Sequence, residues 1–89
     1  MKLYKLSQND NNNYDTYDSC IVCAENEQDA ITISPDVFHT IEEKYEYTSW
    51  ARDVSAITCE EIGEANEKQV RGVVLAFIVT GKQIGRAHV

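Results

Sequence analysis

Two short apolar segments constrain the fold of this 89-residue chain more than any other feature. Every position of Cys20–Ala24 and of Val73–Val79 is apolar, so neither segment alternates between polar and apolar side chains. A strand that is apolar on both faces is typical of the middle of a sheet. Both segments are far shorter than the roughly 20 residues of a membrane-spanning helix. We therefore predict two central strands in one small domain, since a chain of this length supports a single modest core.

Two further segments have the residue types of strands. The alternation at the N-terminus places Tyr4 and Leu6 on one face. The segment around Cys59 is polar on part of one face, which indicates a position nearer an edge. The four predicted strands span residues 2–7, 19–24, 56–62 and 73–79. The polar segment 63–72 is interpreted as a simple hairpin loop that joins the last two strands.

Helix signals lie between the second and third strands. Asn26 is a good N-cap, and acidic residues in the first turn favour a helix over residues 27–33. Ser34 and Pro35 can start a second helix within Ser34–Tyr47, although proline also ends helices, so an irregular segment is the alternative. The sequence predicts an α+β fold in the order β-β-α-(α)-β-β. Its antiparallel or mixed sheet of about four strands would carry one or two helices on one face.

The charge balance restricts the classes of partner. There are 15 acidic against 8 basic side chains, a net charge of −7. Such a surface repels phosphate backbones, so direct nucleic-acid binding is not expected. An acidic protein can instead bind a partner protein with a basic surface, or the charge can simply keep the domain soluble. The first ten residues contain no apolar signal-peptide core, so we expect a cytosolic protein, away from any membrane.

The cysteine pattern favours packing over metal binding. Three cysteines in a cytoplasmic chain indicate free thiols. In a strand, residues three apart point to opposite faces, so the sulfurs of Cys20 and Cys23 diverge. Cys59 and His39 are the only credible additional ligands, and a second Cys-x-x-Cys pair that could complete a tetrahedral site is missing. We predict neither a metal site nor a cofactor.

One loop combines aromatic and acidic side chains. The candidate contact residues are Tyr14, Asp15, Tyr17, Asp18 and Trp50. Tyrosine and tryptophan are frequent anchors of protein interfaces, and loops held by a rigid strand often carry function. The alternative is that Tyr17 and Trp50 pack over the edge of the sheet. Because no acid–base–nucleophile set and no Gly-rich phosphate loop is legible, we expect a protein that is not an enzyme.

The C-terminal segment 84–89 has a sequence that suggests an origin outside the gene. Ile-Gly-Arg-Ala-His-Val can be encoded by ATC GGA AGA GCA CAC GTC, which matches a common short-read sequencing adapter. The next triplet of that adapter is a stop codon. We therefore expect a domain over residues 1–83, a non-native read-through tail over 84–89, and a metagenomic source. A native tail is the alternative.

Several segments resemble a known family. They are MKLYKLSQN, YDTYDSCIVCAENEQDA, ITCEEIGEA and RGVVLA. Together they resemble small hypothetical proteins of phages and prophages of gut bacteria, which typically carry MKLYLLSQ, YDTYDS, AESEEEA and GVVLASFNAG. The resemblance covers most of residues 1–76, and the pattern departs after Ala76. No activity is carried over from this family, so the resemblance implies only a context, that of a phage-encoded accessory protein made in the cytoplasm of its bacterial host.

Three functions are consistent with these features. The leading hypothesis is a non-enzymatic binding protein that inhibits a host factor, such as a CRISPR or other defence component, through the acidic and aromatic surface. A second is a sponge for a nucleotide signal, with a base stacked on Tyr14, Tyr17 or Trp50. A third is a structural or assembly protein that forms a homodimer, because one or two short helices cover only one face of the sheet.

Overall fold

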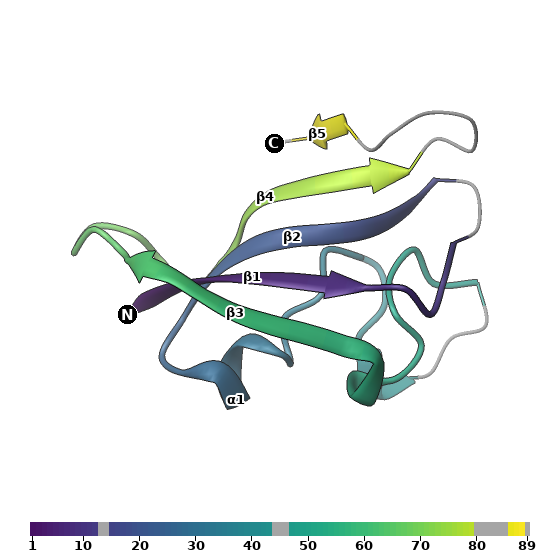
Figure 1. The fold of residues 1–89 in the computed structure, drawn as a ribbon, viewed down its shortest axis with the longest axis horizontal. Coiled ribbons are helices and arrows are strands. Elements are labelled where there is room, and N and C mark those ends of the chain that lie inside the picture. Colours follow the sequence, from purple (N-terminus) through teal and green to yellow (C-terminus); the bar gives the residue numbers. More distant parts are fainter. Residues whose placement is uncertain (13–14, 44–46, 80–85, 89) are drawn as a thin grey trace.

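An antiparallel sheet dominates the computed structural model, which describes residues 1–12, 15–43, 47–79 and 86–88. Five strands lie in the order β3-β1-β2-β4-β5, and each neighbouring pair is antiparallel (Figure 1). Their bounds are Lys2–Gln8 for β1, Thr16–Ala24 for β2, Ile57–Glu64 for β3, Gly72–Val79 for β4 and Arg86–His88 for β5. Residues 86–88 of the suspected read-through tail thus form a short strand beside β4, and the origin of that tail stays a prediction.

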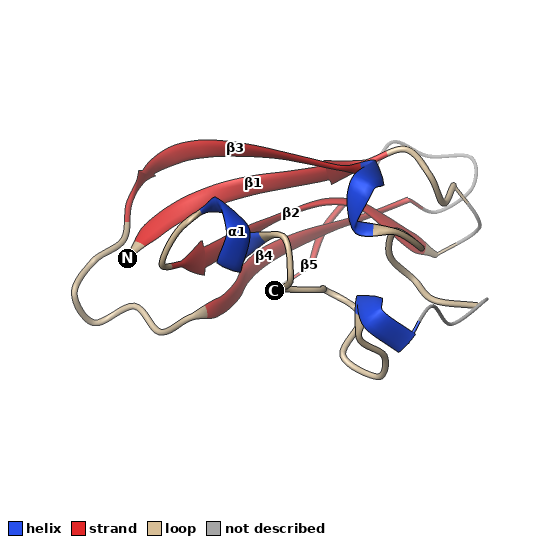
Figure 2. Ribbon diagram, turned by 90° about the horizontal axis from the view of Figure 1, so that it is seen from below, coloured by secondary structure: helices blue, strands red, loops and turns tan. Residues whose placement is uncertain are grey.

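The helical elements are short and lie on one side of the sheet (Figure 2). Helix α1 spans Glu27–Ala30, and two 3₁₀ turns span Ile41–Glu43 (η1) and Val54–Ala56 (η2). The predicted cap of α1 is confirmed, because the Asn26 side chain accepts a hydrogen bond from the Asp29 backbone N–H. None of the described helices has the length and apolarity needed to cross a bilayer.

The core lies between the sheet and these helical segments. Tyr4 and Leu6 of β1 face Val22 and Cys20 of β2, as the predicted alternation requires, while Lys5 is exposed. The buried apolar cluster consists of Tyr4, Leu6, Cys20, Val22, Ala24, Ala30, Ile33, Trp50, Ala51 and Ala76. The central place of β2 agrees with its apolar sequence, because both of its edges are paired.

The opposite face of the sheet carries apolar side chains among polar ones such as Lys5 and Ser19, and the described helical segments lie on the other side. Leu3 lies across from Cys23, and Ile21 lies across from Leu75, with Phe77 on the same side. Leu3, Ile21, Leu75 and Phe77 are only partly buried. Side chains alternate between the two faces of a strand. The core residues of β1, β2 and β4 occupy one face, so these four residues lie on the face that points away from the core.

The predicted hairpin between the third and fourth strands is wrong. β3 pairs with β1, and β4 pairs with β2, so the connection over residues 63–72 spans two strands of the sheet. The physical reason is that the β1–β2 hairpin offers two free edges. The more polar β3 occupies the outer position on one side, whereas the apolar β4 pairs with β2 and has β5 on its far side.

The predicted second helix is also wrong for the part of Ser34–Tyr47 that the structure describes. The only helical residues there belong to the short turn η1, and α1 ends at Ala30 instead of residue 33. The Asp36 side chain prevents a regular helix, because it accepts the Phe38 N–H and also binds residues twelve and thirteen positions further on. The class is therefore a mostly β, small α+β fold with a single short α-helix in the described chain.

Candidate functional site

A buried polar network holds the loop that precedes β2. The Gln8 side-chain amide donates to the carbonyls of Asn11 (2.9 Å) and Tyr17 (2.7 Å). Asn11 in turn donates to the carbonyls of Thr48 (2.7 Å) and Trp50 (2.9 Å). These bonds tie the loop to the segment around Trp50, so the structure brings the two parts of the predicted contact surface together.

The predicted contact residues differ widely in exposure. Asp15 is exposed at a positive φ of 62°, and Asp18 is partly exposed and accepts a hydrogen bond from the Ser19 hydroxyl. Tyr17 is half-buried and packs against the core, and Trp50 is 1% exposed. Tyr14 lies outside the described residues. The packing alternative therefore describes Tyr17 and Trp50, and the two aspartates are the described members that reach the surface.

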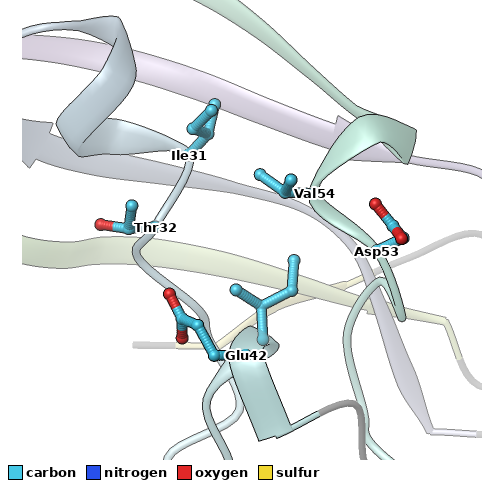
Figure 3. A pocket seen from close by; sticks show the side chains of 6 residues that line it. Ile31, Thr32, Glu42, Asp53 and Val54 are labelled. Atoms are coloured by element: carbon cyan, nitrogen blue, oxygen red, sulfur yellow. The ribbon is translucent and has the colours of Figure 1, made fainter.

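A pocket of about 350 Å³ lies at the surface between α1 and the two 3₁₀ turns. Its apolar lining comes from Ile31, Ile41 and Val54, and Figure 3 shows Ile31 and Val54 facing this hollow from the segments after α1 and at η2. The other three lining residues, Thr32, Glu42 and Asp53, carry oxygen atoms at its margin. We call this hollow the acid-rimmed pocket, because it presents two carboxylates around an aliphatic floor.

Next to η1, the loop at Val37 and Phe38 presents two large apolar side chains to solvent, each 84% exposed. Buried Asp36 anchors this loop. Its carboxylate accepts the Thr48 hydroxyl (2.7 Å) and the backbone N–H groups of Phe38 (2.9 Å) and Ser49 (3.1 Å). We call Val37 and Phe38 the apolar loop. The hydrogen bonds of the neighbouring Asp36 carboxylate fix the backbone of this loop in the exposed position.

The surroundings of Asp36 favour the charged carboxylate form of its side chain. Burial acts to raise its pKa, but the hydrogen bonds from Thr48, Phe38 and Ser49, and then His39 at 3.4 Å, outweigh burial. The pKa of Asp36 is consequently below its ordinary value. A carboxylate that accepts several hydrogen bonds favours its charged form in this way.

A second ion pair lies beside the pocket. Arg71 contacts Asp29 through Nε (3.0 Å) and Nη2 (2.7 Å), and Nη2 lies 3.3 Å from the Thr32 hydroxyl. The Arg71 side chain, followed by the Glu25 backbone N–H, lowers the pKa of Asp29. This ion pair connects α1 to the segment before β4, and the Arg71 guanidinium is paired with the Asp29 carboxylate.

The cysteines lie where the strand geometry predicts. Cys20 is buried in the core, and Cys23 is buried on the opposite face, where its Sγ lies 3.9 Å from the Met1 Sδ. Both thiols are free, and Cys59 is partly buried. Within the described ranges, no group of three or more His, Cys, Asp or Glu side chains is placed to hold a metal ion.

We expect Cys20 to resist alkylation in the folded protein. Burial raises the pKa of its thiol to about 12, so at pH 8 only about one molecule in 10,000 carries the reactive thiolate. Mass spectrometry after iodoacetamide treatment, with and without denaturant, measures this protection. Equal labelling of Cys20 in both conditions would show that the strand is not buried as described.

Sequence reasoning missed the apolar loop and the acid-rimmed pocket. It predicted a second helix within Ser34–Tyr47, whereas the structure places Val37 and Phe38 in an exposed loop. The available signal was Ser34-Pro35-Asp36, because an aspartate after proline often accepts the N–H two residues later and forms a turn.

No protein-family model, curated protein or solved structure matches this chain.

Proposed function

We propose that this chain is a phage-encoded, non-enzymatic binding protein that inhibits a host factor with a basic surface, a defence component such as a CRISPR effector being the class considered first. The binding surface consists of the apolar loop and the acid-rimmed pocket, with the aspartates at 15 and 18 as further acidic contacts. The proposed function is the one expected from the sequence, but the binding surface is now assigned mainly to the exposed side chains of the apolar loop and the pocket.

The exposure of the apolar loop carries this proposal. Two adjacent large apolar side chains in water are unfavourable, and exposed apolar patches on small proteins often mark binding sites. Here three hydrogen bonds to Asp36 hold the loop in place, so the exposure is part of the folded structure. Preorganised loops lose less entropy on binding than flexible ones.

The charges around this surface favour a basic partner. Glu42 and Glu43 on η1 and Asp53 before η2 are exposed, and the chain carries a net charge of −7. Opposite charges accelerate association and select against acidic partners. Apolar anchors surrounded by acidic groups therefore suit a protein surface with cations around an apolar depression.

Replacing Phe38 with Ser is expected to reduce partner binding at least tenfold, because a buried aromatic anchor contributes more than about 1.4 kcal/mol to an interface. The measurement is quantitative capture from lysates of candidate bacterial hosts, followed by affinity measurement with the purified partner. Val70→Ser is the matched control, since Val70 is also apolar and is 75% exposed in a different loop. Equal loss in both variants, or in neither, contradicts the proposal.

The aspartates before β2 provide a separate electrostatic prediction. Asp15→Asn together with Asp18→Asn is expected to leave stability unchanged, because Asn tolerates the left-handed conformation at position 15. Partner binding should fall more at low salt than at high salt, since salt screens exposed charges. Titrations at two salt concentrations measure this effect. Unchanged binding by the folded double variant would restrict the contact surface to the apolar loop and the pocket.

Self-association is a second candidate, favoured by the open face of the sheet. Leu3, Ile21, Leu75 and Phe77 are partly exposed there, and the described helical segments lie on the other side. A homodimer would cover this face. Light scattering that shows a strict monomer at high concentration excludes this candidate without affecting the apolar loop.

The nucleotide-sponge hypothesis has less support from the pocket. None of the six lining residues that lie in the described part of the chain is Lys or Arg, and two of them are acidic. A phosphate needs cations or backbone N–H groups, and nearby carboxylates repel it. A thermal-shift panel of nucleotides tests this alternative directly.

A further inference from the structure

We propose that the acid-rimmed pocket binds the side chain of a lysine or arginine of the partner. The alkyl stem would lie against Ile31, Ile41 and Val54, and the charged head would lie at the rim beside one of the two carboxylates, Glu42 or Asp53. This inference rests on the proposed function, because it names the chemical group by which a basic partner is recognised.

The lining of the pocket matches both halves of such a side chain. Long basic side chains have an apolar stem of methylene groups and a charged tip, and the stem packs favourably on apolar surface. Figure 3 shows Glu42 and Asp53 on opposite sides of the pocket, and the remaining lining includes the aliphatic side chains of Ile31, Ile41 and Val54. A basic side chain in the pocket therefore meets aliphatic carbon along its length and a carboxylate near its tip.

The positions of both acids are fixed by short elements. Glu42 belongs to η1, and Asp53 is the N-cap of η2, where its side chain accepts the Ser55 N–H at 2.9 Å. Ile31 and Ile41 pack against the buried core, which fixes the floor of the pocket. The cation Arg71 is engaged by Asp29 in a bidentate ion pair, so this described cation is directed at Asp29 and not at Glu42 or Asp53.

The volume of the pocket agrees with an occupant of this size. Its value of about 350 Å³ lies at the lower end of the range for ligand pockets. One long basic side chain fits within this space and leaves room for water. The pocket lies close to η1 in the chain segment that also carries the apolar loop, so one partner surface can supply both an apolar depression and a cation.

Small probes test the pocket without a partner. We expect n-butylammonium and n-butylguanidinium chloride to shift the NMR methyl signals of Ile31, Ile41 and Val54, with sodium chloride at equal ionic strength as the reference. The uncharged isostere n-butanol should bind at least about threefold more weakly, because an exposed ion pair contributes up to about 1 kcal/mol. The Val70 methyl signals should not move.

A charge-matched pair of variants assigns the effect to the rim. Glu42→Gln with Asp53→Asn is expected to weaken butylammonium binding about fivefold, and Asn at position 53 keeps the N-cap. Glu43→Gln with Glu60→Gln removes the same charge from exposed positions outside the pocket and should leave the affinity unchanged.

The possible outcomes separate this inference from the proposed function. Equal binding of n-butanol, shifts away from the pocket methyls, or equal weakening in both double variants overturns the inference. If the probes fail while Phe38→Ser still loses the partner, only the pocket assignment is wrong. If the probes bind as expected while Phe38→Ser captures the partner normally, the pocket assignment holds and the apolar loop is not part of the binding surface. If the probes bind but the wild type captures no partner from any host lysate, the proposed function is wrong.

Discussion

Replacing Trp50 with Ala is expected to lower the free energy of unfolding by about 3–5 kcal/mol, the range for removal of a buried large aromatic side chain. Trp50 is among the largest fully buried side chains and belongs to the core cluster. Its backbone carbonyl also accepts the Asn11 amide at 2.9 Å, so a cavity at this position disturbs the loop before β2. A domain of this size has a total stability of about 5–10 kcal/mol, and the variant should be partly unfolded at 37 °C.

Urea denaturation followed by circular dichroism measures this loss, because the variant has no tryptophan fluorescence. Phe38→Ala is the matched control, since it removes a large aromatic side chain that is 84% exposed, and its effect should stay within about 0.5 kcal/mol. A loss below about 1 kcal/mol for Trp50→Ala would show that this ring is not part of the core. It would also restore Trp50 as a candidate surface contact.

Asp36→Ala is expected to cost about 2–4 kcal/mol, because hydrogen bonds to a charged group contribute more than neutral ones and buried donors lose their acceptor. The donors left without this carboxylate are the Thr48 hydroxyl and the N–H groups of Phe38 and Ser49. Asp36→Asn keeps the shape and one acceptor oxygen, so its effect should be smaller. Hydrogen exchange at Phe38 and Ser49 measures the local loosening, and urea denaturation measures the total.

The pH dependence of stability provides the electrostatic part of this prediction. The pKa of Asp36 is lowered in the folded state, so the carboxylate stabilises the fold above its ordinary pKa near 3.8. This stabilisation is lost as the pH falls through the lowered folded value. The wild type should therefore lose stability below about pH 4 more steeply than Asp36→Ala, which lacks the group. Asp29 contributes in the same direction in both proteins. Parallel acid profiles would contradict the anchoring role of Asp36.

Local sequence signals were sufficient to locate four strands and the start of α1, but insufficient for the pairing of the third and fourth strands and for the segment after α1. The two fully apolar segments lie within β2 and β4, and Asn26 caps α1 as expected, because each depends on neighbouring residues. The partner of β3 depends instead on which free edge of the β1–β2 hairpin fits it best. That choice involves residues about 50 positions apart, such as Leu6 and Cys59, and no local pattern encodes it.

The candidate site shows the same limit. Val37, Phe38 and Ile41 recur in the sequence at the spacing of one helix face, but only Ile41 packs against the core. The bonds of Asp36 to Thr48 and Ser49 override that spacing, and they link positions that a periodicity analysis treats as independent. Aromatic residues likewise suggested Trp50 as a contact, whereas burial depends on the tertiary structure around it.

The most direct test of the binding surface is photo-crosslinking from position 38. Phe38 would be replaced by benzoylphenylalanine, which keeps an aromatic side chain at a position 84% exposed, and the same probe at Val70 would serve as the control. We expect ultraviolet light to join position 38, and not position 70, to one host protein with a basic surface, and excess unlabelled wild type should suppress the product. Crosslinks of equal yield from both positions, or none from position 38 while the wild type still captures its partner, would contradict the account.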